Sequence, residues 1–176
     1  RTADNVRAVA ASGRLVGLIG MENAYPLGES VDDVQMWADR GVRYISFTHF
    51  GHNQFGASSN PSTANGDQNH DAGLSELGRV LVRACNDAGV MIDLSHVGRR
   101  TGLEALELSR APVIASHSGA RAVYDNPRNL EDAQLQAIAG AGGVAQMVAF
   151  RSYVGDVDPA AGKALMALRT RLGLNS

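Results

Sequence analysis

The sequence predicts an α/β fold built on a parallel sheet, because short apolar runs alternate with amphipathic stretches along its 176 residues. Five runs are rich in β-branched residues, nearly continuous in hydrophobicity and bounded by glycine or polar clusters. This pattern is typical of strands that are buried on both faces of a parallel sheet. The five predicted strands are Leu15–Met21, Arg43–Thr48, Val90–Ser95, Pro112–Ser116 and Gly143–Ala149.

Helix signals fill the stretches between these runs. Ser30–Arg40 begins with a capping serine and stops at Gly41, and Ser75–Ala88 carries one apolar stripe and stops before Gly89. Residues 1–11 read as part of a helix. Shorter or later helices are predicted at Thr101–Ser109, at Leu130–Ala139 and from Asp158–Pro159 towards Leu172. Strand and helix therefore alternate as about five βα units.

Two architectures are compatible with this alternation, the doubly wound open sheet and the (β/α)8 barrel. No Gly-x-Gly-x-x-Gly or Walker-type loop follows any predicted strand, which removes the strongest support for a nucleotide-binding open sheet. A complete barrel needs roughly 250 residues. If the fold is a barrel, the chain is expected to be a single domain, 1–176, that lacks the first strand and the last strands.

Bulk composition excludes several classes of function. The net charge of −2 gives no electrostatic case for binding nucleic acid or an anionic membrane. No apolar run approaches the roughly 20 residues that span a bilayer. Cys85 is the only cysteine, so no disulfide forms within the chain and the compartment cannot be read from it. The chain begins at Arg1 within a helical stretch, which suggests a segment of a longer protein.

One long polar segment, Phe50 to Asp71, has no periodicity. Loops of this length are typically binding loops, lids or disordered segments, and composition leaves all three open. His52 and His70 lie in this segment. We expect both to be solvated rather than to act as ligands.

Polar side chains that can bind metal or move protons stand at the ends of four successive predicted strands. Because the carboxyl ends of parallel strands meet on one face, these side chains are expected to share one cavity. Imidazole nitrogen and carboxylate oxygen are normal zinc ligands. A lone histidine at such a place is usually structural, but three of the chain's five histidines share it. The four residues are Glu22, His49, His96 and His117.

Two further residues are candidates for supporting roles. Asp93 lies three positions before His96, so strand alternation points it away from that side chain and favours a supporting or structural role. Arg128 follows the fourth strand by a short loop. It could hold a substrate carboxylate with two parallel hydrogen bonds or form a surface salt bridge.

The motifs around these residues resemble the membrane (renal-type) dipeptidase family of zinc metallopeptidases. The resemblance extends from about Leu15 to Tyr153 and rests on the order and spacing of the motifs. They are Gly-Met-Glu22, Arg-Tyr-Ile-Ser-Phe-Thr-His49, Ile-Asp-Leu-Ser-His96, Pro-Val-Ile-Ala-Ser-His117-Ser and Arg128-Asn129. It implies a (β/α)8 barrel, two zinc ions per complete active site, dipeptide substrates (some with a C-terminal D-residue) and a homodimer.

The resemblance also implies a role for each residue. Glu22 is expected to bridge both zinc ions, and His96 and His117 to bind the second. His49 is expected to contact substrate and to stabilise the tetrahedral intermediate, and Arg128 to bind the terminal carboxylate. The implied reaction is attack by a metal-bridging hydroxide on the peptide carbonyl.

The chain also departs from the family pattern. The family's first strand carries a His-x-Asp pair that binds the first zinc, and no such pair precedes Glu22. A late-strand Asp is expected to fall beyond Ser176. The polypeptide alone is therefore expected to be inactive. Two alternatives remain open: a metal-free barrel with a binding or structural role, and an amidohydrolase acting on non-peptide amides.

Overall fold

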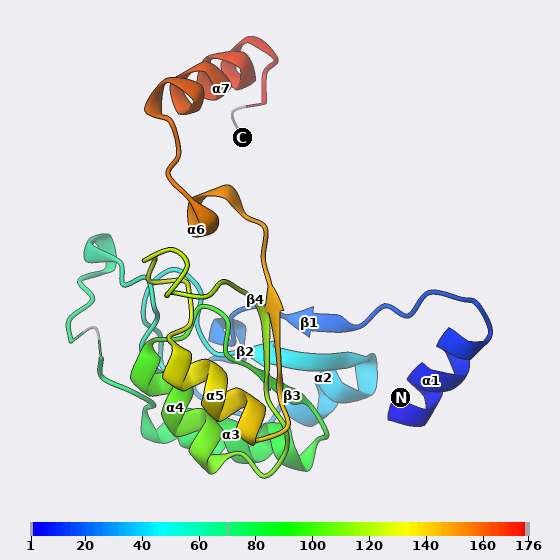
Figure 1. Cartoon of the computed structure of the whole chain (residues 1–176). Coiled ribbons are helices and arrows are strands. Elements are labelled where there is room, and N and C mark those ends of the chain that lie inside the picture. Colours follow the sequence, from blue (N-terminus) through cyan, green and yellow to red (C-terminus); the bar gives the residue numbers. More distant parts are fainter. Residues whose placement is uncertain (1, 70, 175–176) are drawn as a thin grey trace.

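The protein was analysed as a computed structural model that describes residues 2–69 and 71–174. Its centre is a five-stranded sheet made of β1 (Ile19–Met21), β2 (Val42–Ser46), β3 (Met91–Asp93), β4 (Ile114–Ser118) and β5 (Val144–Met147). Each strand pairs in parallel with the next one along the chain (Figure 1). A doubly wound sheet would reverse its strand order partway through, and this sheet does not. The order β1-β2-β3-β4-β5 is that of an incomplete (β/α)8 barrel, as predicted.

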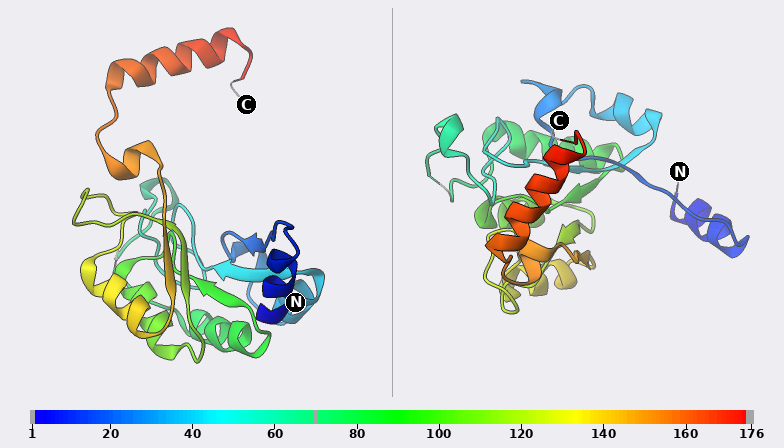
Figure 2. Two further views of the ribbon diagram at one scale, coloured as in Figure 1. Left: turned by 45° about the vertical axis from the view of Figure 1, so that its right-hand side comes forward. Right: turned by 90° about the horizontal axis from the view of Figure 1, so that it is seen from above.

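Four helices separate the strands: α2 (Val34–Arg40), α3 (Glu76–Asp87), α4 (Arg99–Leu108) and α5 (Asp132–Gly140). Of these, α3, α4 and α5 lie side by side along one face of the sheet (Figures 1 and 2). Contacts join α3 to α4 and α4 to α5, and the two views agree on this layer (Figures 1 and 2). The Ser75 hydroxyl accepts a hydrogen bond from the Gly78 amide, which caps α3 where the sequence predicts its start.

The predicted start of the first amphipathic helix at Ser30 is wrong. Helix α2 begins at Val34, and the Ser30 hydroxyl accepts a hydrogen bond from the amide of Asp32 instead. A serine hydroxyl can bond to the backbone of a turn as well as to the first turn of a helix. Ser30 therefore stabilises the turn that precedes α2 and does not cap the helix. The helix ends as predicted, because Gly41 adopts a left-handed conformation there.

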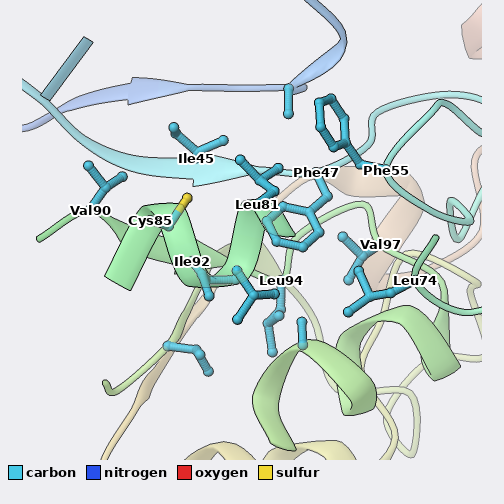
Figure 3. Packing of buried hydrophobic residues seen from close by; sticks show 14 of the residues in the cluster. Ile45, Phe47, Phe55, Leu74, Leu81, Cys85, Val90, Ile92, Leu94 and Val97 are labelled. Carbon is cyan, nitrogen blue, oxygen red and sulfur yellow. The ribbon is translucent and has the colours of Figure 1, made fainter. Parts of the chain in front are cut away.

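The hydrophobic core lies between the sheet and its helix layer. Leu81 and Cys85 of α3 pack against Ile45 and Ile92 of the central strands, and all four are almost completely buried (Figure 3). Gly20 on the neighbouring strand β1 lies directly under the Tyr44 side chain. A Cβ atom there would lie 2.1 Å from the ring of Tyr44, its pairing partner on β2. The core thus fixes the strands whose ends carry the polar residues.

The two outer strands differ from the prediction that every strand is buried on both faces. Ile19 on β1 is 58% exposed, and Val144 and Met147 on β5 are 55% and 56% exposed. Each of these strands has a neighbour on only one side among the described residues. Beyond them lie α1 (Ala3–Ala11) at one end and α6 (Arg151–Val154) and α7 (Pro159–Arg171) at the other, with no buried residue in any of the three (Figures 1 and 2).

The long polar segment is held in place by hydrogen bonds. The carboxylate of Asp67 accepts from the amides of His52 and Ser62, at 2.8 and 2.5 Å. The Ser59 amide donates to the carbonyl of His96 at 2.8 Å, which ties the loop to the end of β3. Two short 3-10 turns complete the described elements, Tyr25–Leu27 and Thr63–Asn65. No helix in the described part of the chain is long and apolar enough to cross a membrane.

Candidate metal centre

The four strand-end residues meet at one edge of the sheet. Glu22 directly follows β1, and His49 and His96 lie three residues after β2 and β3. His117 lies within β4, one residue before the strand ends. A parallel sheet with sequential strand order places these ends next to one another, so residues 95 positions apart in the chain come into contact.

The carboxylate of Glu22 is at the centre of the group. Its Oε1 lies 3.0 Å from Nε2 of His96, 3.1 Å from Nε2 of His117 and 3.7 Å from Nε2 of His49. The Nε2 atoms of His96 and His117 are 2.9 Å apart. One oxygen and two nitrogens, from residues at or just beyond the ends of β1, β3 and β4, therefore lie mutually within 3.1 Å.

The donor set at this point fits a cation. A carboxylate oxygen offers only lone pairs, and a neutral imidazole has one proton for its two nitrogens. A divalent cation placed among these three atoms would accept a lone pair from each of them. Ligand atoms of Glu22, His49 and His96 also lie within 4.8 Å of one another. Nitrogen and oxygen donors of this kind are those that zinc prefers.

His96 is buried and neutral. Burial lowers the pKa of its imidazole to about 2, and the charges of Arg128, His49 and His117 act in the same direction. Only a neutral imidazole has a lone pair to give to a metal. Nδ1 of His96 is buried with no hydrogen-bond partner in the described part of the chain, so no hydrogen bond there fixes which nitrogen is protonated.

The backbone of His96 adopts a left-handed conformation with φ of 70°. This conformation costs about 1–2 kcal/mol for a residue with a side chain. Three donors hold it by converging on the His96 carbonyl: Oγ1 of Thr48 at 3.1 Å, Oγ of Ser58 at 3.2 Å and the Ser59 amide at 2.8 Å. Two of the three come from the polar loop, so that segment helps to aim the His96 ring.

His49 occupies the open side of the cluster. Its ring centroid lies 4.2 Å from that of His96, and Phe50 packs edge-on against both rings at 4.4 and 5.5 Å. The His49 side chain is 37% exposed, whereas that of His96 is 4% exposed. His49 is thus the histidine of this pair that an approaching molecule can reach.

Arg128 lies beside His117 but is buried. Its Nη2 donates to the His117 carbonyl at 3.1 Å, its guanidinium carbon lies 5.2 Å from the Tyr153 ring centroid, and its exposed fraction is 2%. Nε has no hydrogen-bond partner among the described residues. Arg128 lines a cavity of about 200 Å³ together with Arg99, Arg121 and Glu131. None of the four strand-end residues lines this cavity. The alternative of a surface salt bridge for Arg128 is therefore wrong, because the side chain does not reach the surface.

The remaining expectations have mixed outcomes. Asp93 is 1% exposed and accepts hydrogen bonds from Ser116, as a supporting residue would. The expectation that His52 is solvated is wrong: its side chain is 16% exposed, its Nδ1 accepts from the Ser58 amide and its Nε2 donates to the Gln68 carbonyl. His70 lies outside the described residues.

Sequence reasoning overlooked two side chains at the site. Ser116 contacts the ring of His117, and its place directly before a strand-end histidine was the available signal. Tyr153 covers Arg128 from a segment 25 residues further along the chain. No local pattern marks Tyr153, because the contact arises only when the chain after β5 returns over the site.

Comparison with known proteins connects this geometry to one family. The model of the membrane dipeptidases, peptidase family M19, matches residues 1–168. The dipeptidase verJ of Clonostachys rogersoniana is 38% identical over 144 residues, which are 82% of this chain and 36% of that protein. The dipeptidase tcpJ of Claviceps purpurea is 35% identical over 157 residues, 89% of this chain and 36% of that protein.

Solved structures show the same relationship. The probable dipeptidase PvdM from Pseudomonas aeruginosa superimposes with a TM-score of 0.83 at 40% identity, over 97% of this chain and 43% of that one. A metallopeptidase from Rhodobacter sphaeroides, liganded with a phosphinate mimic of L-Ala-D-Ala, gives a TM-score of 0.76 at 30% identity, over 98% and 51%. The chain thus spans between a third and about half of the length of these relatives. On its sequence and its fold, the chain belongs to the membrane dipeptidase family of metallopeptidases, peptidase family M19.

Proposed function

We propose that this chain provides the zinc ligands Glu22, His96 and His117 of a dipeptidase that hydrolyses the peptide bond of dipeptides. The observation that carries the proposal is the contact of Glu22 Oε1 with both imidazole Nε2 atoms at 3.0 and 3.1 Å. In a complete site with two zinc ions, Glu22 would be a ligand of both, since its half-exposed carboxylate has a second oxygen to offer. Residues 1–176 would form one continuous domain of the barrel.

Zinc supplies two effects when bound: it polarises a carbonyl group, and it makes hydroxide available near neutral pH. The residues of the chain bind the metal and position the substrate. The negative carboxylate of Glu22, at the centre of the cluster, offsets the positive charge of the metal. His49 reaches the open side, where its Nε2 can donate a hydrogen bond to the oxyanion that forms when the peptide carbonyl is attacked. His96 is held neutral by burial and so stays a ligand across the physiological pH range.

Arg128 is proposed to bind the free carboxylate of the dipeptide. A guanidinium group matches a carboxylate with two parallel hydrogen bonds, and a single positive group close to the scissile bond selects short substrates. Its Nε is the free donor for this contact. The Tyr153 ring lies over the guanidinium, so the contact requires that ring to move aside or the carboxylate to enter from the cavity that Arg128 lines.

A dipeptide with a C-terminal D-residue is the first substrate to test. Its support is the Rhodobacter sphaeroides neighbour, whose bound ligand mimics L-Ala-D-Ala. A second candidate activity, hydrolysis of non-peptide amides, is supported by a Pseudomonas aeruginosa amidohydrolase with a TM-score of 0.71 at 30% identity. The two differ in their need for a free carboxylate beside the scissile bond.

The deciding experiment uses a protein that carries this chain at the full length of its relatives. Metal analysis should find about two zinc ions per protomer, and hydrolysis of Ala-D-Ala should be lost on chelation and restored by zinc. Turnover of lactones or carboxylate-free amides without turnover of dipeptides would favour the second candidate. Protein that holds no metal above background and cleaves none of these substrates would favour a binding or structural role and exclude the proposal.

A further inference from the structure

A half-buried serine, Ser116, links an aspartate to the ring of His117. Oγ of Ser116 lies 2.5 Å from Oδ2 of Asp93 and 2.7 Å from Nδ1 of His117. Asp93 ends β3, while Ser116 and His117 are consecutive residues of β4. The contact therefore crosses between the two strands whose ends carry His96 and His117. Neither Asp93 nor Ser116 is used by the function proposed above.

The proton positions along this link follow from what each group can donate. A carboxylate accepts hydrogen bonds and donates none, so the single hydroxyl proton of Ser116 points to Asp93. The Ser116 oxygen then has only lone pairs to offer to the ring. Facing this oxygen, Nδ1 of His117 is the nitrogen that carries the proton of the neutral imidazole, and Nε2 offers its lone pair when a cation stands between it and the Glu22 carboxylate. That lone pair faces Oε1 of Glu22 and Nε2 of His96, at 3.1 and 2.9 Å.

We propose that Asp93, acting through Ser116, is a positioning residue that fixes the tautomer of His117 and presents its Nε2 lone pair to the metal. The inference rests on the proposed function for the role of His117 as a ligand, but the proton placement can be tested without metal. Hydrogen bonds to the second nitrogen of a ligand histidine orient the ring, and losing them typically weakens metal binding by about 10–100-fold.

The surroundings of Asp93 keep it as an acceptor. Its other oxygen, Oδ1, accepts from the amides of Ser95 and Ser116 at 3.0 and 2.9 Å. The side chain is 1% exposed, so water does not compete for these bonds. The Ser95 hydroxyl in turn accepts from the His117 amide at 2.9 Å, which fixes the backbone of the ligand. The contrast with His96 is clear, because the Nδ1 of that ring has no such partner in the described structure.

One substitution separates proton placement from structure. In Asp93→Asn, the amide oxygen can keep both backbone hydrogen bonds of Oδ1, while the amide nitrogen donates to Ser116. The Ser116 proton then turns to Nδ1 of His117, and the imidazole proton moves to Nε2. The fold is retained, but the lone pair is removed from the metal side. A structural role alone would predict no change of tautomer.

The first measurement is ¹⁵N NMR of the imidazole nitrogens in the metal-free chain at pH about 8, where unperturbed histidines are neutral. A Glu22→Ala background removes the carboxylate acceptor that faces Nε2 of His117 at 3.1 Å. With Asp93 and Ser116 intact, the proton of His117 should sit on Nδ1. In Asp93→Asn it should sit on Nε2, and in Ser116→Ala the preference for Nδ1 should be lost. A ring protonated on Nε2 with Asp93 and Ser116 intact, or an Asp93→Asn ring still protonated on Nδ1, would overturn the proposal.

The second measurement is zinc affinity by competition with a chromophoric chelator. Asp93→Asn and Ser116→Ala should each weaken binding by about 10–100-fold, and Ser116→Thr should restore it because the hydroxyl is kept. Ser118→Ala is the matched control, since this buried serine lies two positions along the same strand and does not touch the ring. An equal loss of zinc affinity in Ser118→Ala would contradict the proposed role of Asp93 and Ser116. Absence of zinc binding in the wild type, with the tautomers as expected, would instead contradict the proposed metal function.

Discussion

Nε2 of His96 lies 2.9 Å from Nε2 of His117, although 21 residues separate them in the chain. Both atoms also lie within 3.1 Å of the same oxygen of Glu22. Such crowding of lone pairs is relieved when a cation binds, so zinc should stabilise the folded chain more than it affects the unfolded one.

Zinc at about 100 times its dissociation constant should raise the free energy of unfolding by about 2.7 kcal/mol. Glu22→Gln should abolish this gain, because a neutral amide cannot replace the carboxylate at the centre of the cluster. Glu29→Gln, which removes the same charge at an exposed position, should retain it. Thermal unfolding with zinc and with chelator measures both. An equal gain in both variants would place the metal elsewhere.

Arg128 should determine the requirement for a free carboxylate. Arg128→Lys keeps the charge but loses the planar fork. In a protein that carries this chain at the full length of its relatives, we therefore expect KM for a dipeptide to rise about 10–100-fold. Turnover of the same substrate as its C-terminal amide should change little. The control is Arg83→Lys, on the exposed side of α3. Equal loss on the acid and the amide would contradict the assigned role.

Glu104 should stabilise the junction of the polar loop with α3 and α4. Its carboxylate accepts from the Leu74 amide at 3.1 Å, from Arg79 at 2.9 Å and from Arg100 at 2.7 Å. Burial acts to raise the pKa of Glu104, but the hydrogen bonds from Arg100 and Leu74 and the two arginine charges outweigh it, and the pKa is lowered. A lowered folded-state pKa means that this stabilisation is present at neutral pH and is lost as pH falls below about 4.5.

Glu104→Gln should therefore lower the free energy of unfolding by about 1–2 kcal/mol at neutral pH, and by less in acid. Urea unfolding of the metal-free chain at neutral pH and at a pH below the titration of Glu104 gives the two free energies. Glu107→Gln, exposed on the same helix, provides the baseline. If Glu104→Gln lost as much stability in acid as at neutral pH, the ionised carboxylate would not be the source of the stabilisation.

Cys85 should resist alkylation in the folded chain. It is fully buried in the core, and burial raises the pKa of its thiol to about 12. The reactive species is the thiolate, so iodoacetamide at pH about 8 should modify the native chain only as it unfolds. Mass spectrometry reads a single site, because no other cysteine is present. Urea-unfolded chain is the control, and rapid modification of the native chain would contradict the packing around α3.

The same shift affects stability in alkali. The folded thiol holds its proton to a higher pH than the unfolded thiol, whose pKa is 9.0. Ionisation of Cys85 therefore leaves the free energy of unfolding unchanged below about pH 9 and lowers it as pH rises towards 12. Cys85→Ala would remove this dependence, at the cost of a small cavity in the core. Urea unfolding at pH about 8 and about 10 shows whether the slope is lost.

The sequence alone determined the alternation of strands and helices and the positions of Glu22, His49, His96 and His117 near strand ends. Periodicity and capping are local properties, and the carboxyl ends of parallel strands are brought together by any fold of this class. Sequence reasoning also predicted the start of α3 at its capping serine. It misplaced the start of α2, because a serine hydroxyl can bond to a turn as readily as to a helix.

Only the tertiary structure decided how these residues meet. The contact of Ser116 with Asp93, the cover of Tyr153 over Arg128 and the three donors on the His96 carbonyl all join segments that are distant in the chain. The exposure of β1 and β5 likewise depends on which neighbours a strand has. Hydrogen bonds and burial depend on distance and direction in space, and a linear pattern of residue types carries neither.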